Sequence, residues 1–180
     1  PCFDPLTTRT IDAAGTSPIF IAGDANNFIP LLHEAADEGR IAGRNAARLA
    51  LGSEVTPVPR RVPIGIVFTD PQIGIVGGGY HALSAGSFVS GQASFEDQGR
   101  SRIMLKNKGL LKVYADPATG RFLGAEMLVP AAEHLAHLLA WALQNRMTVA
   151  QMLEMPFYHP VIEEGLRTAL RDVKAKLRPA

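Results

Sequence analysis

The sequence lacks the materials for several kinds of site. It contains one cysteine, Cys2, so no intrachain disulfide can form and no site of several zinc-binding thiolates can be built. The formal net charge is only +1 and no polybasic run occurs, which argues against nucleic acid as the main partner. The apolar runs are far shorter than the roughly 20 residues that cross a membrane, and no secretory apolar segment is seen at the start. We therefore expect a cytoplasmic protein that binds neither nucleic acid nor membranes.

What the sequence does contain is enough apolar material for a packed core. Of its 180 residues, 47% are hydrophobic, which favours a folded protein over a disordered one. A stretch rich in proline, serine and threonine runs from Gly52 to Arg61, a composition typical of an extended linker. The sequence thus predicts two parts, residues 1–52 and residues 62–180, joined by a linker over 53–61.

The first part offers one strand and one helix. The apolar run Pro18–Asp24 predicts a short buried strand of the kind found in parallel sheets that are covered on both faces. Good helix formers then predict a helix from about Pro30 to Leu51, which should end at Gly52. One strand and one helix do not make a domain, so we expect this part to be the last piece of a larger α/β unit.

The second part has strands first and helices last. Its alternating or apolar runs predict strands at residues 64–69, 73–77, 87–95, 102–105, 110–115 and 122–128. Its 3.6-residue periodicity predicts helices at residues 132–145, 149–153 and 160–177, after a brief helix around 80–85. The composition of residues 116–120 predicts a hairpin-type turn between the last two strands. This order predicts an α+β fold, an antiparallel sheet flanked by helices.

The most informative residues stand near the end, where His159 precedes Pro160 and Glu164 follows five residues after the histidine. A proline at the first helical position would hold His159 at the start of a helix, with Glu164 about one turn inside. A carboxylate that orients an imidazole is the core of a general base. The same spacing also suits a helix-capping histidine that is bonded to a glutamate.

Two further positions are candidates for ligand binding in the first part. Asp24 follows a predicted strand, and ligands of open α/β sheets lie at the carboxyl ends of strands. Its carboxylate can accept hydrogen bonds from polyol hydroxyls, or it can be a plain turn residue. The predicted helix start at Leu31, Leu32 and His33 offers free amides, which favour an anion or a polarised carbonyl.

Two other patterns are interpreted as structural, with a helix-borne metal site at the second, His134 and His137, kept as an alternative. Residues 77–82 fit the loose G-x-G-x-x-A form of a dinucleotide loop, but antiparallel hairpins rather than a βαβ unit are predicted after it, so these glycines are expected to serve a turn. His134 and His137 have the i, i+3 spacing of a metal-binding pair. No further ligand accompanies them, so no metal site is predicted.

Taken together, these residues resemble the FAD-dependent pyridine nucleotide–disulfide oxidoreductases, most of all the dihydrolipoamide dehydrogenases. The resemblance covers nearly the whole chain, but only the C-terminal part of the family's length. Residues 19–24 are similar to the family's second FAD motif, which implies that Asp24 contacts the ribityl chain of FAD. It also implies that the amides of Leu31, Leu32 and His33 face the pyrimidine edge of the flavin.

Residues 67–77 are similar to the entry into the family's interface domain, which implies a homodimer formed through residues 62–180. The terminal His-Pro-x-x-x-Glu is similar to the family's acid/base motif. The resemblance implies that His159 reaches across the dimer to the partner's flavin and redox disulfide, where it serves a lipoyl-type dithiol and Glu164 orients it. Val161 replaces the family's usual threonine and Phe157 a polar residue, so the exact dithiol stays open.

The family's other parts do not occur in these 180 residues: the first dinucleotide motif, the Cys-x4-Cys redox pair and the nicotinamide-binding domain. The resemblance therefore implies a C-terminal fragment of an enzyme that uses FAD and NAD when intact. Alone, the fragment is expected to be inactive and to hold no FAD tightly. The alternatives are a free-standing dimerisation module and a fragment of a glutathione-reductase-like enzyme. The presence of His159 argues against the mercuric reductase type.

Overall fold

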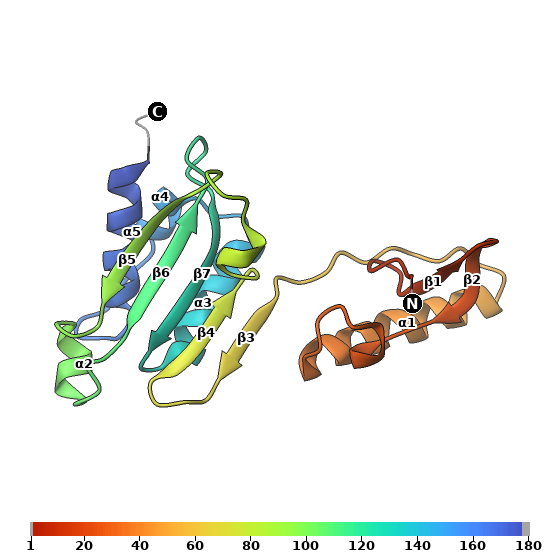
Figure 1. Ribbon diagram of the computed structural model, residues 1–180, viewed down its shortest axis with the longest axis horizontal. Coiled ribbons are helices and arrows are strands. Elements are labelled where there is room, and N and C mark those ends of the chain that lie inside the picture. Colours follow the sequence, from red (N-terminus) through yellow and green to blue (C-terminus); the bar gives the residue numbers. More distant parts are fainter. Residues whose placement is uncertain (1, 178–180) are drawn as a thin grey trace. The chain divides into compact units, whose positions relative to one another are not determined.

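The structure is a computed structural model that describes residues 2–177. The chain divides into two compact units, Pro1–Arg61 and Val62–Ala180 (Figure 1). Residues 53–63 contain no helix or strand, so the second unit begins within an extended segment. Each unit has its own secondary structure and is described by itself below.

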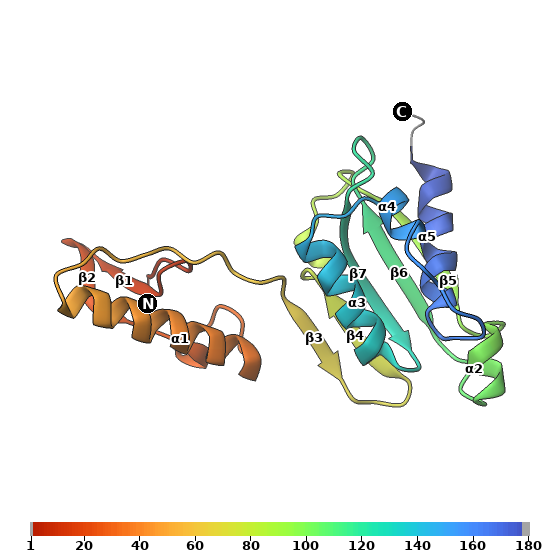
Figure 2. The ribbon, with the colours of Figure 1, turned by 180° about the vertical axis from the view of Figure 1, so that it is seen from behind.

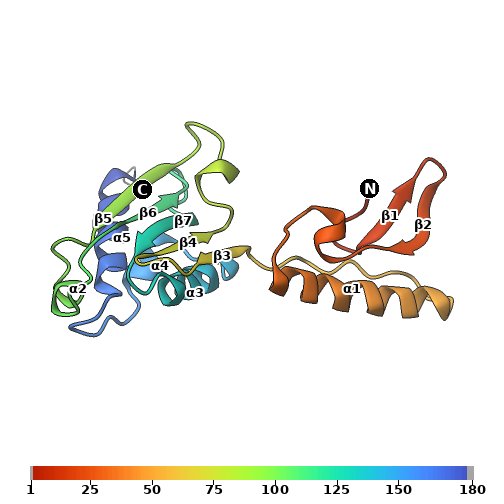
Figure 3. The ribbon, with the colours of Figure 1, turned by 60° about the horizontal axis from the view of Figure 1, so that its bottom comes forward.

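The first unit is built on a hairpin and one long helix. Its elements are β1 (Arg9–Asp12), β2 (Gly15–Phe20), the short 3-10 helix η1 (Gly23–Asn26) and α1 (Leu32–Ala50). β1 and β2 pair in antiparallel register, and β2 packs against α1 (Figure 3).

The predicted buried strand of a parallel sheet is wrong in this structure. β2 begins at Gly15, ends at Phe20 and pairs only with β1 among the described residues. Its side chains are mostly exposed, and Ile19 is 63% exposed. The apolar run indicates that the segment needs a covering layer, but it does not indicate which strand pairs with it. A two-residue turn after β1 brings an antiparallel partner within reach.

The predicted helix of the first unit is confirmed, together with its end at a glycine. α1 ends with Leu51 as its C-cap, and Gly52 follows with a positive φ of 70°. The Gly52 amide donates to Leu49 O at 3.0 Å and the Ser53 amide to Arg48 O at 2.9 Å. These two bonds form a Schellman motif, which only a residue tolerant of left-handed backbone completes without strain.

The second unit is a five-stranded antiparallel sheet with the strand order β3-β4-β7-β6-β5. The strands are β3 (Ile64–Val67), β4 (Gln72–Val76), β5 (Val89–Ser94), β6 (Leu110–Ala115) and β7 (Phe122–Val129). The helices are η2 (Tyr80–Ala82), α2 (Gly99–Ile103), α3 (Ala132–Gln144), α4 (Val149–Leu153) and α5 (Glu164–Lys176). The predicted α+β fold with an antiparallel sheet is confirmed.

The core lies between one face of this sheet and the helices α3 and α5 (Figure 2). Alternate residues of the strands point to that face, as a strand's period of two requires. Fully buried members include Val76, Leu111, Val113, Val129, Leu135, Leu139, Leu170 and Val173. At Gly91 in β5 a Cβ atom would collide with the backbone of α5 at Ala169 and Val173, so glycine allows this close approach.

One predicted strand of the second unit is wrong. Residues 102–105 belong to the end of α2 and the turn after it, not to a strand. The cause is local capping: the Gln98 side chain accepts a hydrogen bond from Ser101 N at 2.7 Å, and the buried Ser101 hydroxyl donates to Phe95 O at 2.8 Å. These bonds satisfy a helix start instead of a strand ladder.

The last predicted helix begins later than expected. α5 starts at Glu164 with Glu163 as its N-cap, and residues 156–163 contain no helix or strand. The Glu164 carboxylate accepts the Val161 amide at 3.3 Å, so the side chain of the first helical residue bonds to the segment before the helix. Pro160 is therefore not the first helical residue, and Glu164 opens the helix rather than lying one turn inside it.

The glycines of residues 77–79 form a turn, as expected. Gly77, Gly78 and Gly79 all have positive φ angles, between 63° and 79°. The strand before them, β4, has only antiparallel neighbours, so it does not open a βαβ unit.

Candidate functional site

The structure brings His159 and Glu164 together. His159 Nδ1 lies 3.1 Å and 3.0 Å from the two carboxylate oxygens of Glu164. The His159 side chain is 79% exposed and the Glu164 side chain only 18% exposed. The imidazole therefore stands at the surface on a carboxylate that the protein holds in place, with Nε2 accessible to a second molecule.

Three groups hold the Glu164 carboxylate. Besides His159, the Val161 amide donates to Oε2 at 3.3 Å and Arg167 Nη2 donates to Oε1 at 2.9 Å. The hydrogen bond from His159, followed by the Val161 amide and the charge of Arg167, holds the pKa of Glu164 below its usual value. Glu164 is then ionised at neutral pH and can only accept hydrogen bonds.

An ionised acceptor decides which tautomer the imidazole adopts. Because Glu164 cannot donate, the neutral His159 ring must carry its proton on Nδ1. Its Nε2 lone pair then faces outward and can take a proton, after which Glu164 stabilises the imidazolium. This geometry suits a surface general base that acts on a group presented from outside the second unit.

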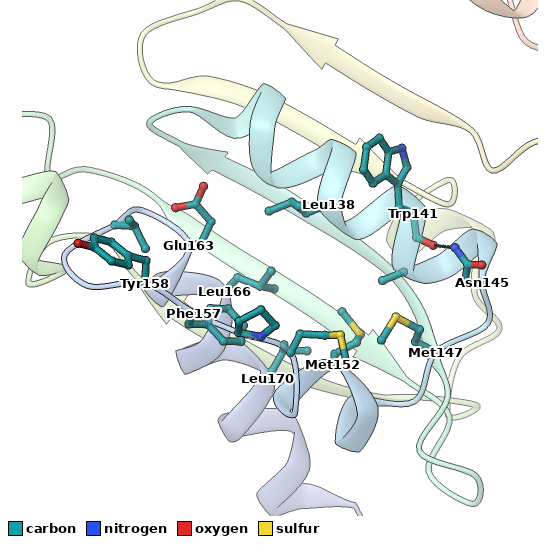
Figure 4. A pocket seen from close by; sticks show the side chains of 14 residues that line it. Leu138, Trp141, Asn145, Met147, Met152, Phe157, Tyr158, Glu163, Leu166 and Leu170 are labelled. Carbon is teal, nitrogen blue, oxygen red and sulfur yellow. Dashed lines mark hydrogen bonds between the residues drawn. The ribbon is translucent and has the colours of Figure 1, made fainter.

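An apolar groove of about 430 Å³ lies beside this loop (Figure 4). Leu138 and Trp141 of α3 line it together with Met152 of α4, Leu170 of α5 and Tyr158 of the loop. Trp141 is 68% exposed and Leu138 44% exposed, although both lie on a helix that otherwise packs into the core. Large exposed apolar side chains around a groove are typical of an interaction surface rather than of a finished core.

In the first unit, Asp24 and the start of α1 lie side by side. Asp24 is exposed within η1, and Leu32 and His33 are exposed at the first helical positions after the N-cap Leu31. A Cβ atom at Gly23 would lie 3.1 Å from Ala35 Cβ, so the Asp24 turn packs directly on the first turn of α1. No side chain caps the start of α1. The Leu31 amide donates to Ile29 O at 2.8 Å, whereas the amides of Leu32 and His33 are left for another acceptor.

A buried charge cluster supports this turn, and the sequence alone did not point to it. Glu38 Oε2 accepts from Gly23 N at 2.6 Å, and Glu38 Oε1 accepts from Arg60 Nη1 at 2.8 Å. Arg60 Nη2 also donates to Glu34 Oε2 at 2.6 Å. Burial alone would lower the Arg60 pKa, but the hydrogen bonds and charges of the two glutamates raise it above its ordinary value.

The signal that could have revealed the cluster is the position of its two glutamates. Glu34 and Glu38 have the i, i+4 spacing of one helix face, and Ile41 and Asn45 continue that face. Ile41 and Asn45 are buried, so carboxylates in the same row require partners.

The two histidines with metal-binding spacing, His134 and His137, have ordinary partners. His137 Nδ1 lies 2.6 Å from Glu133 O, and His134 Nε2 lies 3.7 Å from Glu133 Oε1. Within residues 2–177, no three His, Cys, Asp or Glu side chains are grouped so that they could hold a metal ion. In the same range, no helix combines the length and the apolarity that crossing a bilayer requires.

Comparison with known proteins places the second unit in a family. Residues 63–170 match the family described as pyridine nucleotide-disulphide oxidoreductase, dimerisation domain. A solved structure of LpdA from Mycobacterium tuberculosis superposes with a TM-score of 0.75 at 29% identity, over 94% of this chain and 35% of that one.

Curated relatives with three different names match the chain about equally well. An NAD(P)H dehydrogenase (quinone) from Mycobacterium tuberculosis is 29% identical over 94% of the chain. A mercuric reductase from Acidithiobacillus ferrooxidans is 30% identical over 87% of it, and a dihydrolipoyl dehydrogenase from Haloferax volcanii 31% identical over 86%. The matched part makes up 34%, 29% and 32% of these relatives, so the chain spans about a third of their length.

Proposed function

Because the chain belongs to the pyridine nucleotide-disulphide oxidoreductase family, we propose that it is the C-terminal part of a flavoprotein of the dihydrolipoamide dehydrogenase type. The intact enzyme would oxidise a lipoyl-type dithiol to the disulfide and reduce NAD to NADH. The observation that carries this proposal is the His159–Glu164 pair, with Nδ1 held by the carboxylate and Nε2 exposed. The relatives span three substrate classes at 29–31% identity, so the choice of a dithiol rests on this pair and not on similarity.

The first unit supports the proposal that further layers cover it in an intact enzyme. Ile19 is 63% exposed, Leu32 89% exposed and Phe28 46% exposed. Its sheet has two strands within residues 2–61, and an isolated two-stranded sheet is marginal in water. We infer that residues 1–52 are the C-terminal piece of an FAD-binding domain and residues 62–180 the interface domain, joined by the linker 53–61.

The residues of the first unit fit the flavin cofactor in their chemistry. The exposed Asp24 carboxylate suits the hydroxyls of a ribityl chain. The uncapped α1 start suits a polarised flavin carbonyl through the amides of Leu32 and His33, while the Leu31 amide is bonded to Ile29 O. FAD, when bound, supplies the electron transfer between the dithiol side and NAD. NAD would bind outside these 180 residues.

His159 has a proton-transfer role in this proposal. A thiolate, not a thiol, attacks a disulfide, so the dithiol substrate must lose a proton before exchange. His159 Nε2 takes that proton, while Glu164 keeps Nδ1–H oriented and stabilises the charged ring. The base would act in the site of the partner subunit, as the resemblance to the family implies, and the redox cysteines would lie outside these 180 residues.

The homodimer is proposed to form through the second unit. Trp141, Leu138 and Tyr158 present exposed apolar surface around the groove, and Trp and Tyr are typical anchors of protein interfaces. The groove adjoins the loop that carries His159, so a subunit docked there would meet the imidazole. A cytoplasmic location suits this chemistry, because dithiols persist in reducing compartments.

We expect the 180-residue chain, purified alone, to be inactive. It carries the base but neither the redox cysteines nor the nicotinamide site, so it should give no NADH from dihydrolipoamide and NAD. It should also be colourless, since one side of the flavin site alone binds FAD weakly. Absorbance at 340 nm and the visible spectrum of the purified chain are the measurements, and measurable turnover or a yellow preparation would contradict the proposal.

A further inference from the structure

The Glu38 carboxylate is a buried charged group of the first unit that three donors hold. Its side chain is 0% exposed. It accepts hydrogen bonds from Gly23 N at 2.6 Å, from Asn26 Nδ2 at 2.7 Å and from Arg60 Nη1 at 2.8 Å. These donors come from both ends of η1 and from the linker, so one carboxylate joins three segments that are distant in sequence.

A buried carboxylate is tolerated only when such partners satisfy it. Removing a charge from water costs several kcal/mol unless hydrogen bonds and an opposite charge replace the lost hydration. Here Arg60 supplies the charge, with its side chain 13% exposed, and Gly23 and Asn26 supply the remaining donors. The bonds to the turn are therefore required by Glu38 and cannot be exchanged for bonds to water without loss.

Further contacts hold the segment 23–28 in addition to the hydrogen bonds of Glu38. Asn26 Oδ1 accepts the Phe28 amide at 2.8 Å, and the Arg60 guanidinium lies 5.7 Å from the centroid of the Phe28 ring. Gly23 has a φ of 71° and faces Ala35 closely, so a larger residue there would be strained. The segment 23–28 is thus held from both sides by one helix and one arginine.

Asp24 lies between the two residues that Glu38 holds, while its own carboxylate is exposed. We propose that Glu38, locked by Arg60, is a positioning residue that fixes Asp24 relative to the start of α1 for contact with the flavin. This inference rests on the proposed function, because it takes the flavin as the ligand of Asp24. Glu38 itself would touch neither substrate nor cofactor.

Glu34 provides a matched control for Glu38. It lies one helical turn earlier, its side chain is 5% exposed, and it pairs with the same arginine at 2.6 Å. Its carboxylate oxygens make no hydrogen bond to η1 among the described residues. A role in general stability should depend on both glutamates, whereas positioning of the turn should depend on Glu38.

The first test uses the 180-residue chain and needs no cofactor. In Glu38→Gln the charge is lost and one acceptor oxygen becomes an NH2 group, which faces either the Arg60 donor or the donors of Gly23 and Asn26. NMR measures the hydrogen-exchange rate of the Gly23 amide in each variant. We expect this rate to rise about tenfold in Glu38→Gln and to stay within about twofold of wild type in Glu34→Gln. Unchanged Gly23 exchange in Glu38→Gln would overturn the inference. So would equal acceleration at the Ser53 amide of the distant Schellman motif, because that result indicates general loosening.

The second test uses the intact enzyme and separates this inference from the proposed function. The visible flavin spectrum and the retention of FAD are compared in Asp24→Asn, Glu38→Gln and Glu34→Gln. We expect the first two variants to shift the flavin bands and to lose FAD more readily, and Glu34→Gln to match wild type. If Asp24→Asn changes the flavin and Glu38→Gln does not, the positioning role is wrong. If Asp24→Asn leaves the flavin unchanged, the proposed flavin contact fails, and the inference fails with it.

Discussion

Replacing His159 with glutamine in the intact enzyme is expected to lower kcat for dithiol oxidation by about 10²- to 10⁴-fold, the usual contribution of a positioned general base. Glutamine keeps a polar group of similar size but cannot accept the thiol proton. The loss should shrink as pH rises toward the pKa of the dithiol, because the thiolate then forms without a base. Steady-state assays with dihydrolipoamide and NAD across this pH range measure both effects.

His134→Gln is the matched control for this substitution. His134 is also an exposed histidine of the second unit, with its side chain 72% exposed, but it lies on α3 beside Glu133. It should keep wild-type turnover and wild-type FAD content. Glu164→Gln should lose less activity than His159→Gln, since it removes the orienting acceptor but leaves the base. Wild-type turnover in His159→Gln would contradict the acid/base role of His159.

Introducing a charge into the apolar groove is expected to separate the subunits. The wild-type chain of 19.3 kDa should behave in solution as a particle of twice that mass. Trp141 is 68% exposed on α3, and a tryptophan anchor at the centre of an interface typically contributes about 2–4 kcal/mol. Trp141→Glu should therefore weaken the dimer about 30- to 1,000-fold and yield a monomer at micromolar concentration.

Ile103→Glu tests whether the effect belongs to the groove. Ile103 is 62% exposed at the end of α2 and does not line the groove. This variant should keep the wild-type mass in analytical ultracentrifugation, and both variants should keep wild-type circular dichroism. A dimer that survives Trp141→Glu, or that dissociates equally in Ile103→Glu, would contradict the proposed interface.

The parts of the fold that sequence predicted well are those in which one face is buried. The strands at residues 110–115 and 122–128 can be predicted because alternate side chains pack against α3 and α5. The strand predicted at residues 102–105 is wrong because two side chains upstream, Gln98 and Ser101, cap a short helix there. Capping depends on individual hydrogen bonds, which periodicity does not record.

The candidate site divides in the same way. The contact between His159 and Glu164 could be predicted because five residues separate them, although the start of the helix was placed too early. The hydrogen bond between Glu38 and Gly23 could not be predicted, since the two residues are 15 positions apart. The Arg60 partner of Glu38 lies a further 22 positions along the chain. Resemblance to a family suggested the cofactor, but it gave no indication of the buried charges that hold the turn.

We propose that His159 completes an active site on the partner subunit. Two inactive variants of the intact enzyme test it when they are co-expressed: His159→Gln, and a variant whose redox cysteines are replaced by serine. Random pairing makes half of the dimers mixed, and each mixed dimer has one site with both groups, so about a quarter of wild-type activity should return. Co-expressed subunits no more active than either variant alone would show that His159 does not act across the dimer.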